Sequence, residues 1–252
     1  MIDLRGKKAL ITGGSRGIGR ATSILFAKAG ADVAVTYQRR EEAAVEVKKT
    51  VETLGRRCLT TKVEISDQTE VKRAVDGIIH EYGRIDVLVN NAGIWTYLEI
   101  GSGDVKAWKE TMEIDLDSAY YFTDAVVHHM KKNKQGGIIN VGSTAGIRGE
   151  AFHSHYAATK GALNALTKSW AVEFAPHNIR VNLVAPGWVE TDMCAGVFSD
   201  PAFKESVRQS IPLKRIPPPE DIAGPILFLA SGLARHITGA IINVNGGAVL
   251  CG

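Results

Sequence analysis

A short apolar run followed by closely spaced glycines and an amphipathic segment constrains the fold of this chain more than any other feature. Residues 8–12 form the run, Gly13, Gly17 and Gly19 follow it, and apolar residues recur at helical spacing over residues 21–29. The pattern predicts a strand, a tight turn and a helix. Glycines at such a turn let the backbone approach a pyrophosphate, which free N–H groups at the helix N-terminus attract. They also occur in turns that need only positive φ angles, and the spacing differs from the general dinucleotide fingerprint, so the segments that follow decide between the two interpretations.

The alternation of strand and helix continues along the whole chain. No linker, repeat or low-complexity tract divides residues 1–252. We therefore predict an α/β, single-domain Rossmann fold, a doubly wound parallel sheet of about seven strands with helices on both faces. The further strands are expected at residues 32–37, 57–63, 85–89, 137–141, 179–185 and 239–244, and the main helices at residues 41–54, 67–82, 105–133 and from Tyr156 through Phe174.

Composition excludes several classes of protein. The formal net charge is only +3 and the charges are interleaved, which is not the pattern of a nucleic-acid binder. The three cysteines, Cys58, Cys194 and Cys251, give neither a disulfide framework nor a metal spacing. His153 and His155 have no third ligand at a metal-binding spacing, so we expect loop histidines and no metal. No signal region and no run near the ~20 apolar residues of a membrane span is present, so we expect a cytoplasmic protein without membrane contact.

The residues that follow the second predicted strand bear on the choice of dinucleotide. A carboxylate there suits the ribose 2′-hydroxyl of NAD, whereas a 2′-phosphate requires cations. Tyr37 is followed closely by Arg39 and Arg40, and Arg16 lies in the glycine turn. Guanidinium groups bind phosphate with paired hydrogen bonds. We therefore expect NADP(H) as the preferred cofactor and NAD(H) as the alternative, although arginines at a strand end are also common as ordinary solvated residues.

Tyr156 and Lys160 are four residues apart on a predicted helix, so their side chains share one face. A cation beside a phenol favours the phenolate and makes tyrosine a usable acid and base near neutral pH. Alone this pair is weak evidence, because it arises by chance on many helices as a half-buried ring beside a solvated lysine. Ser143 lies thirteen residues earlier, in the exit loop of the predicted fifth strand, so both hydroxyls could face one carbonyl oxygen.

Five motifs follow one another along the chain, namely Thr12-Gly13-x-x-x-Gly17-Ile18-Gly19, Asn90-Asn91-Ala92-Gly93, Ser143, Tyr156-x-x-x-Lys160 and Pro186-Gly187. In this order they resemble the short-chain dehydrogenase/reductase family over essentially the whole chain. Residues 186–193 and 244–247 are most similar to its 3-oxoacyl-(acyl-carrier-protein) reductase branch. The resemblance implies hydride transfer between a nicotinamide cofactor and a small carbonyl or alcohol substrate. An acyl thioester is one of the possible substrates.

The resemblance also implies roles for the catalytic residues. Tyr156 would protonate the carbonyl oxygen or deprotonate the alcohol, and Ser143 would orient that oxygen. Lys160 would lower the pKa of Tyr156 and hold the nicotinamide ribose. The fourth catalytic position is an asparagine in the family and Asp115 here. An aspartate keeps the carbonyl-type acceptor, so we expect activity to persist. Its charge would compete with Tyr156 for Lys160, so we expect a changed pH profile.

Cofactor contacts are expected in the glycine turn, at the carboxyl ends of the strands and on the active-site helix. Glu64 occupies the place of a family aspartate that contacts adenine. The full set is Gly13, Ser15, Arg16, Gly17, Ile18, Gly19, Tyr37, Arg39, Arg40, Glu64, Ile65, Asn91, Ala92, Gly93, Tyr156, Lys160, Pro186, Gly187, Val189 and Thr191.

Several alternatives remain open at this point. The same site suits a dehydrogenase of a secondary alcohol, sugar or polyol, and a non-catalytic dinucleotide sensor would keep the fold. Residues 188–212 are expected to form a mobile substrate lid, or else a surface-packed pair of short helices. His128 and His177 stand where acyl-carrier reductases have arginines for an acidic partner, which argues against that substrate. The family commonly pairs the helices near residues 105–133 and 155–175, so we expect a homotetramer.

Overall fold

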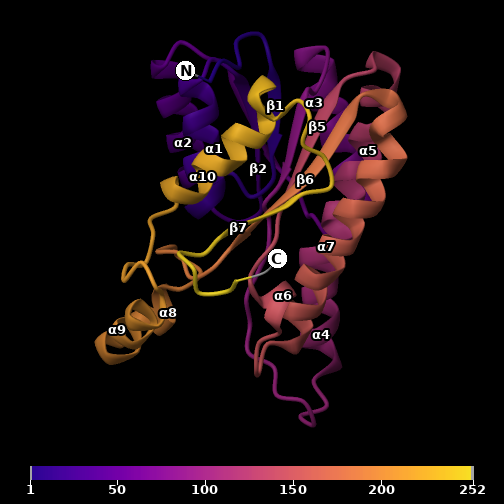
Figure 1. Cartoon of the computed structure of the whole chain (residues 1–252). Helices are drawn as coiled ribbons and strands as arrows, with labels where there is room; N and C mark the ends of the chain where they lie inside the picture. The colour runs from indigo at the N-terminus through magenta and orange to yellow at the C-terminus, as the bar shows by residue number, and fades with distance from the viewer. Residues whose placement is uncertain (1, 251–252) are drawn as a thin grey trace.

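Seven parallel strands form one sheet in the computed structural model, which describes residues 2–250 (Figure 1). Every predicted strand is present, with ends that differ by no more than two residues from the expected ones, and the predicted Rossmann fold is confirmed. The order across the sheet is β3-β2-β1-β4-β5-β6-β7. The strands are β1 (Lys8–Ile11), β2 (Asp32–Tyr37), β3 (Cys58–Lys62), β4 (Val87–Asn90), β5 (Gly136–Val141), β6 (Ile179–Pro186) and β7 (Ile241–Val244).

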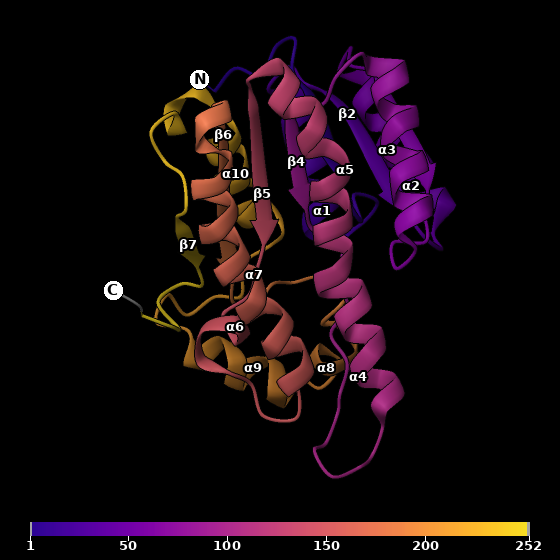
Figure 2. The same cartoon turned by 90° about the vertical axis from the view of Figure 1, so that its right-hand side faces the viewer.

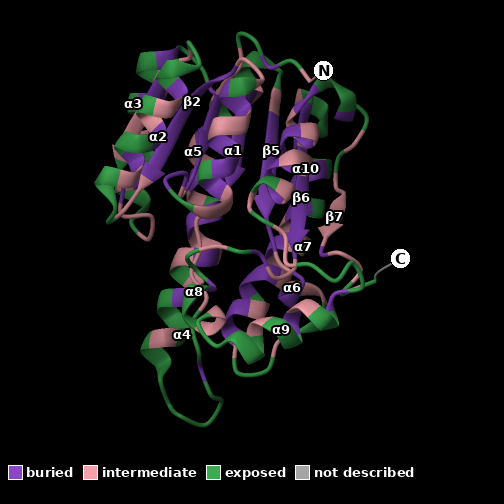
Figure 3. Cartoon of the chain, turned by 90° about the vertical axis from the view of Figure 1, so that its left-hand side faces the viewer, coloured by how far each residue is buried: buried purple, intermediate pink, exposed green. Residues whose placement is uncertain are grey.

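Helices cover both faces of this sheet. On one face lie α1 (Gly17–Lys28), α2 (Glu41–Thr53) and α10 (Glu220–Ala230), and on the other lie α3 (Gln68–Tyr82), α5 (Ser118–Asn133) and α7 (Ser154–Phe174) (Figures 2 and 3). Each layer has its own apolar core, because alternate strand residues point to opposite faces. Phe26 of α1 and Phe122 of α5 are fully buried in the two cores.

The smaller helices extend beyond the carboxyl ends of the strands, below the sheet in Figure 2. They are α4 (Val105–Met112), α6 (Ala145–Arg148), α8 (Ala195–Phe198) and α9 (Pro201–Ser210). The helix expected over residues 105–133 is interrupted by a π-helical turn at Glu113–Asp117. The segment 188–212 contains two short helices, as the simpler alternative held, and whether it moves as a lid stays a prediction.

The strand order places a crevice at the carboxyl end of the sheet. The chain leaves β1 toward β2 and β3 on one side and returns to β4 on the other side of β1. The connections from β1 and β4 therefore diverge in opposite directions, and a ligand crevice opens between them. The register sets Ile11 of β1 opposite Val89 of β4, so the glycine turn and the segment from Asn91 to Gly93 emerge side by side.

A buried polar network holds the catalytic helix against the sheet. The Asn90 side-chain amide donates to Asn140 Oδ1 at 2.9 Å, and the Asn140 amide donates to Thr167 Oγ1 of α7 at 2.9 Å. All three residues are almost fully buried. Buried amides without partners are costly, so this chain of hydrogen bonds favours a single position of α7 relative to β4 and β5.

Candidate active site

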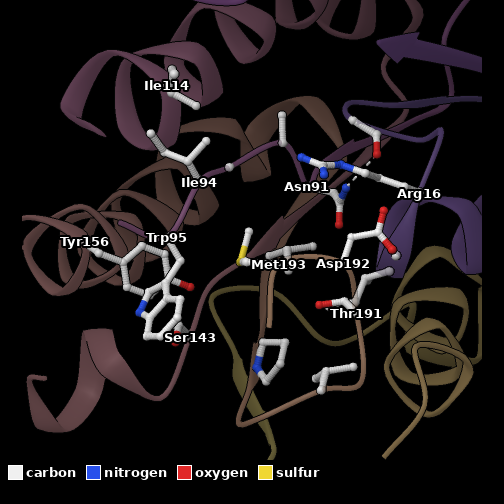
Figure 4. Close-up of a pocket in the computed structure, with 18 of the residues that line it drawn as sticks. Arg16, Asn91, Ile94, Trp95, Ile114, Ser143, Tyr156, Thr191, Asp192 and Met193 are labelled. Atoms are coloured by element: carbon white, nitrogen blue, oxygen red, sulfur yellow. Dashed lines mark hydrogen bonds between the residues drawn. The ribbon is translucent and has the colours of Figure 1, made fainter. Parts of the chain in front are cut away.

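A cavity of about 610 Å³ lies at the carboxyl ends of the strands. Its walls come from the β1–α1 turn, the ends of β2, β4, β5 and β6, and the first turns of α7. Figure 4 shows Ser143, Tyr156 and Trp95 toward one end and Arg16, Asn91 and Asp192 toward the other. The cavity thus joins the predicted catalytic residues to the predicted cofactor contacts.

The glycine turn is shaped to receive an extended ligand. Gly13 and Gly17 have φ angles of +61° and +51°, which side chains rarely tolerate. Arg16 precedes α1 without a side-chain cap, so the first N–H groups of that helix are left for a ligand. Gly19 does not line the cavity. It packs beneath the turn, where a Cβ would stand only 2.4 Å from the Gly13 carbonyl oxygen. These features fit a dinucleotide pyrophosphate.

Thr12 and Asn91 brace this turn from below. The Thr12 hydroxyl accepts hydrogen bonds from the backbone N–H groups of Asn91 and Ala92 at 2.9 and 3.0 Å. The Asn91 side-chain amide donates to the Thr12 carbonyl at 2.9 Å. The reciprocal bonds fix the first turn of the fold to the end of β4.

The three arginines expected to bind a phosphate all line the cavity at its cofactor end. Arg39 makes no hydrogen bond or ion pair with the residues the structure describes, whereas Arg40 pairs with Asp192 at 2.9 Å. Arg16 faces the same space (Figure 4). Glu64 lies outside this cavity and accepts a hydrogen bond from Gln38 at 2.6 Å. Its carboxylate therefore shapes the end of β2, and its neighbour Ile65 lines the cavity instead.

Ser143, Tyr156 and Lys160 meet on one wall of the cavity. Gly146 makes this meeting possible, because α6 crosses α7 so closely that a Cβ at Gly146 would stand 2.4 Å from the Lys160 carbonyl carbon. The close crossing brings the loop after β5 onto the helix that carries Tyr156. Lys160 Nζ lies 5.5 Å from the centre of the Tyr156 ring.

The phenol of Tyr156 is held in its protonated form. Burial and then the negative charge of Asp115 raise its pKa above the ordinary value, and the hydrogen bond with Ser143 acts in the opposite direction. The expected lowering of the pKa of Tyr156 by Lys160 is therefore not the dominant effect, since burial and then the charge of Asp115 raise that pKa.

Asp115 lies on the π-helical turn, behind the cavity wall, with 1 % of its surface exposed. Its Oδ1 accepts the Ile94 N–H at 2.8 Å, and its Oδ2 lies 3.3 Å from Lys160 Nζ. Burial raises the pKa of Asp115, and the attraction of Lys160 opposes this. Gly93 covers the pair, because a Cβ there would stand 3.1 Å from Asp115 Oδ2. Asp115 thus touches Lys160 and does not line the cavity itself.

The segment that follows β6 closes the cavity on another side. Pro186, Gly187, Val189 and Thr191 all line it, as expected. A Cβ added at Gly187 would stand 3.1 Å from the Cβ of Asn245, so this position needs a small residue.

Aromatic rings from three loops surround the substrate end. Trp95 stacks on His153 with ring centroids 4.3 Å apart and meets Trp188 edge-on at 5.6 Å. Trp188 in turn contacts Phe198 and Phe203 of α8 and α9. The two short helices are therefore attached to the catalytic loops through aromatic contacts.

The sequence did not identify many residues that line this end. Trp95 directly follows the Asn90–Gly93 motif and Trp188 follows Pro186-Gly187, so their positions beside motifs were the only available signal. The residues of the cavity wall that were not singled out include Ile94, Trp95, Thr96, Glu110, Ile114, Arg148, Glu150, Trp188, Asp192, Met193 and Cys194, and the last four lie in the segment 188–212 that was expected to cover the substrate.

The two loop histidines contact residues beside the cavity. His153 packs against Trp95, and the buried His155 shares a hydrogen bond with Thr96 Oγ1 at 2.9 Å.

Within residues 2–250, no group of three metal-ligating side chains is present. Among the same residues, no helix combines the length and apolar character needed to cross a membrane. Cys251 lies outside the described residues, and Cys58 and Cys194 are free thiols.

Comparison with known proteins gives matches over nearly the full chain. The family model described as enoyl-(acyl carrier protein) reductase matches residues 13–249. A 3-oxoacyl-(acyl-carrier-protein) reductase of Thermotoga maritima is 39% identical, over 98% of this chain and 99% of that protein. An L-rhamnose 1-dehydrogenase (NAD(P)(+)) of a Sphingomonas strain is 36% identical, over 97% of this chain and 96% of that protein.

A solved structure is similar as well. It is described as a short-chain alcohol dehydrogenase from Sinorhizobium meliloti, and it matches with a TM-score of 0.94 at 34% identity, covering 98% of this chain and 97% of that one. These relatives are named as reductases or dehydrogenases, and the substrates in their names differ.

Proposed function

The chain belongs to the short-chain dehydrogenase/reductase family and is an NAD(P)(H)-dependent oxidoreductase, and we propose that it reduces a ketone or 3-oxoacyl group to a secondary alcohol. The observation that carries this proposal is the common wall formed by Ser143, Tyr156 and Lys160 in the cavity that also contains the glycine turn. When bound, the nicotinamide cofactor supplies the hydride.

The proposed roles follow from the contacts of each side chain. Ser143 and Tyr156 line the same cavity, and Ser143 is close enough to lower the pKa of Tyr156, so a carbonyl oxygen placed between them would accept hydrogen bonds from both hydroxyls. Tyr156 would donate its proton to that oxygen, and the carbonyl carbon would take the hydride that a bound cofactor supplies. Burial and Asp115 raise the pKa of Tyr156, so the phenol stays in the protonated form that carbonyl reduction needs.

Lys160 and Asp115 act together behind the tyrosine. Lys160 Nζ donates to the Val141 carbonyl at 3.4 Å and pairs with Asp115, so the ammonium is held at the cavity wall. There it can hold ribose hydroxyls of the cofactor, as the family resemblance implies. Asp115 contributes a negative charge where the family has a neutral amide.

Asp115→Asn should change the pH dependence of the reaction. Removing the carboxylate charge lowers the pKa of Tyr156, because Asp115 is one of the causes that raise it. In the direction of alcohol oxidation the rate rises with pH as Tyr156 loses its proton, and we expect this rise to occur at lower pH in the variant. The measurement is kcat against pH for both proteins. An unaltered profile would remove Asp115 from the proposed mechanism.

We propose NADP(H) as the preferred cofactor, supported by the three arginines at one end of the cavity. Replacing Arg39 and Arg40 together by alanine should weaken NADPH binding by roughly 10- to 100-fold, because hydrogen bonds to charged groups are lost. NADH lacks the 2′-phosphate, so its dissociation constant should change little. Titration calorimetry with each cofactor measures both constants.

Arg20→Ala is the matched control for this cofactor prediction. Arg20 is exposed on α1 and does not line the cavity, so its loss removes a positive charge without touching the site. Equal losses of NADPH and NADH affinity in the Arg39 and Arg40 variant would refute the phosphate contact.

A second candidate function is the oxidation of a sugar or polyol. The observation that favours it is the polar side of the substrate end, where Arg148 and Glu150 line the same cavity as Trp95 and Trp188. Carboxylate and guanidinium groups bind the hydroxyls of a sugar, and indole rings pack against the apolar face of a sugar ring. A relative named as an L-rhamnose dehydrogenase is consistent with such a substrate.

An acyl-carrier substrate receives less support. His128 is exposed on α5 and His177 is half-buried after α7, where a docking surface for an acidic partner would need cations. A non-catalytic dinucleotide sensor is disfavoured for a different reason, since it has no need for Ser143, Tyr156 and Lys160 on one wall.

One experiment distinguishes these functions. NADPH and NADH consumption is followed with 3-oxoacyl thioesters, cyclic ketones and sugar ketones, and the reverse reaction is followed with sugars and polyols. We expect the highest kcat/KM for a ketone or 3-oxoacyl compound with NADPH. Turnover confined to sugars and polyols would replace it with the second candidate, and no turnover with any compound would favour the sensor.

We further propose a cytoplasmic homotetramer on the family resemblance. Tyr120 of α5 and Val172 of α7 are 48% and 78% exposed on the helices that relatives commonly pair. Burying such apolar side chains favours association. Mass photometry measures the number of subunits.

A further inference from the structure

One ion pair joins two distant segments across the cofactor end of the cavity. Arg40 Nη1 donates to Asp192 Oδ2 at 2.9 Å, although the residues are 152 positions apart. Arg40 lies between β2 and α2, and Asp192 lies on the segment between β6 and α8. Both line the cavity, and Figure 4 shows Asp192 beside Arg16.

Neither side chain has a second partner among the described residues. The pair is the one hydrogen bond that either makes with its side chain, and the two side chains are 59% and 48% exposed. Thr191, next to Asp192, lies against Gly17 of the glycine turn, with 3.4 Å between its Cγ2 and a Cβ built on that glycine. Asp192 is therefore held at the place where the arginines face the cavity.

We propose that Asp192 determines cofactor selectivity by competing with the 2′-phosphate for Arg40. This rests on the proposed use of Arg39 and Arg40 for that phosphate. A guanidinium that binds phosphate through two hydrogen bonds must release the carboxylate that already occupies it. The released carboxylate would then stand near a second anion, which opposes binding.

The consequence differs between the two cofactors. NADH carries a 2′-hydroxyl, so Arg40 keeps its pair with Asp192 and no charge is displaced. NADPH binds only after the exchange of partners. Asp192 thus weakens the binding of NADPH and not that of NADH. It reduces the preference for NADPH over NADH that the arginines create, so the protein can still use NAD(H).

The test is Asp192→Asn with dissociation constants for both cofactors, measured by quenching of intrinsic tryptophan fluorescence. Exposed ion pairs are weak, so we expect NADPH to bind roughly two- to fivefold more tightly and NADH to bind as before. The gain should shrink with added salt, because salt screens exposed charges.

Glu190→Gln is the matched control. It removes the same charge two residues away, but Glu190 pairs with Lys204 of α9 and does not line the cavity. Its NADPH affinity should equal that of the parent. The same gain in this control would show a general charge effect and overturn the proposal, as would equal changes for NADPH and NADH in Asp192→Asn.

A double variant separates this proposal from the one on which it rests. With Arg40→Ala already present, Asp192→Asn should no longer improve NADPH binding, because the contested partner is gone. A gain that persists there overturns the competition for Arg40. If Arg39→Ala and Arg40→Ala leave NADPH affinity unchanged, the phosphate contact itself is wrong. If they weaken it and Asp192→Asn has no effect, only the role of Asp192 is wrong.

Discussion

Tyr156→Phe should lower kcat by about 10²- to 10⁴-fold, the usual contribution of a positioned acid or base. The variant loses the hydroxyl that faces Ser143 and leaves the ring and the cavity walls in place. NADPH should therefore still bind, since the glycine turn and the arginines are untouched. Steady-state turnover and the NADPH dissociation constant measure the two properties separately.

Tyr82→Phe provides the matched control for this prediction. Its hydroxyl donates to the Val33 carbonyl at 2.8 Å in the core, away from the cavity. Its loss should cost about 1 kcal/mol of stability and leave kcat unchanged. Turnover of Tyr156→Phe at the parent rate would show that this tyrosine is not the catalytic acid or base.

Lys160→Met should lower the free energy of unfolding by about 3–5 kcal/mol near pH 8, because it leaves Asp115 buried and unpaired. Turnover should fall as well, since the ammonium at the cavity wall is lost. Urea unfolding at several pH values measures the stability, and each value is compared with that of the parent protein.

The loss should depend on pH in a defined direction. Burial raises the pKa of Asp115 above that of the unfolded chain, near 4, and removing Lys160 takes away the opposing attraction. Between the two pKa values the folded protein binds more protons, so its stability falls as pH rises. The deficit of Lys160→Met should therefore be small near pH 4 and grow toward alkaline pH.

Two further variants test this explanation. Lys160→Met combined with Asp115→Asn removes the unpaired charge and should recover most of the lost stability and lose the pH dependence. Lys168→Met changes an exposed lysine of the same helix and should have little effect. A deficit that is independent of pH, or one that the double variant does not relieve, would argue against a buried ion pair.

Most of the residues predicted from the sequence to contact the cofactor line the same cavity. Glycines with positive φ and arginines at a strand end leave a local signature, because the chain segment that forms the contact also carries the motif. Glu64 and Gly19 are the exceptions, since they shape the turn or strand end without lining the cavity. The pairing of Asp192 with Arg40 had no signal in the sequence, because the two residues are 152 positions apart.

The substrate half required the structure. Trp95, Glu150 and Trp188 come from three separate loops, and the tertiary structure brings the two indole rings into contact while Phe198 of α8 and Phe203 of α9 pack on Trp188. No spacing in the sequence encodes such a meeting. The break of the helix at Glu113–Asp117 was missed for the same reason, since its apolar pattern continues on both sides.

By itself the sequence determined the fold, the order of the elements and the position of Tyr156 and Lys160 on one helix face. These features depend on local periodicity and on short motifs, which a single chain carries in full. Tertiary structure alone decided that Gly146 lets Ser143 approach Tyr156, and that Asp115 is buried against Lys160. The physical reason is that desolvation and close approach depend on what packs around a residue, and those neighbours are distant in the sequence.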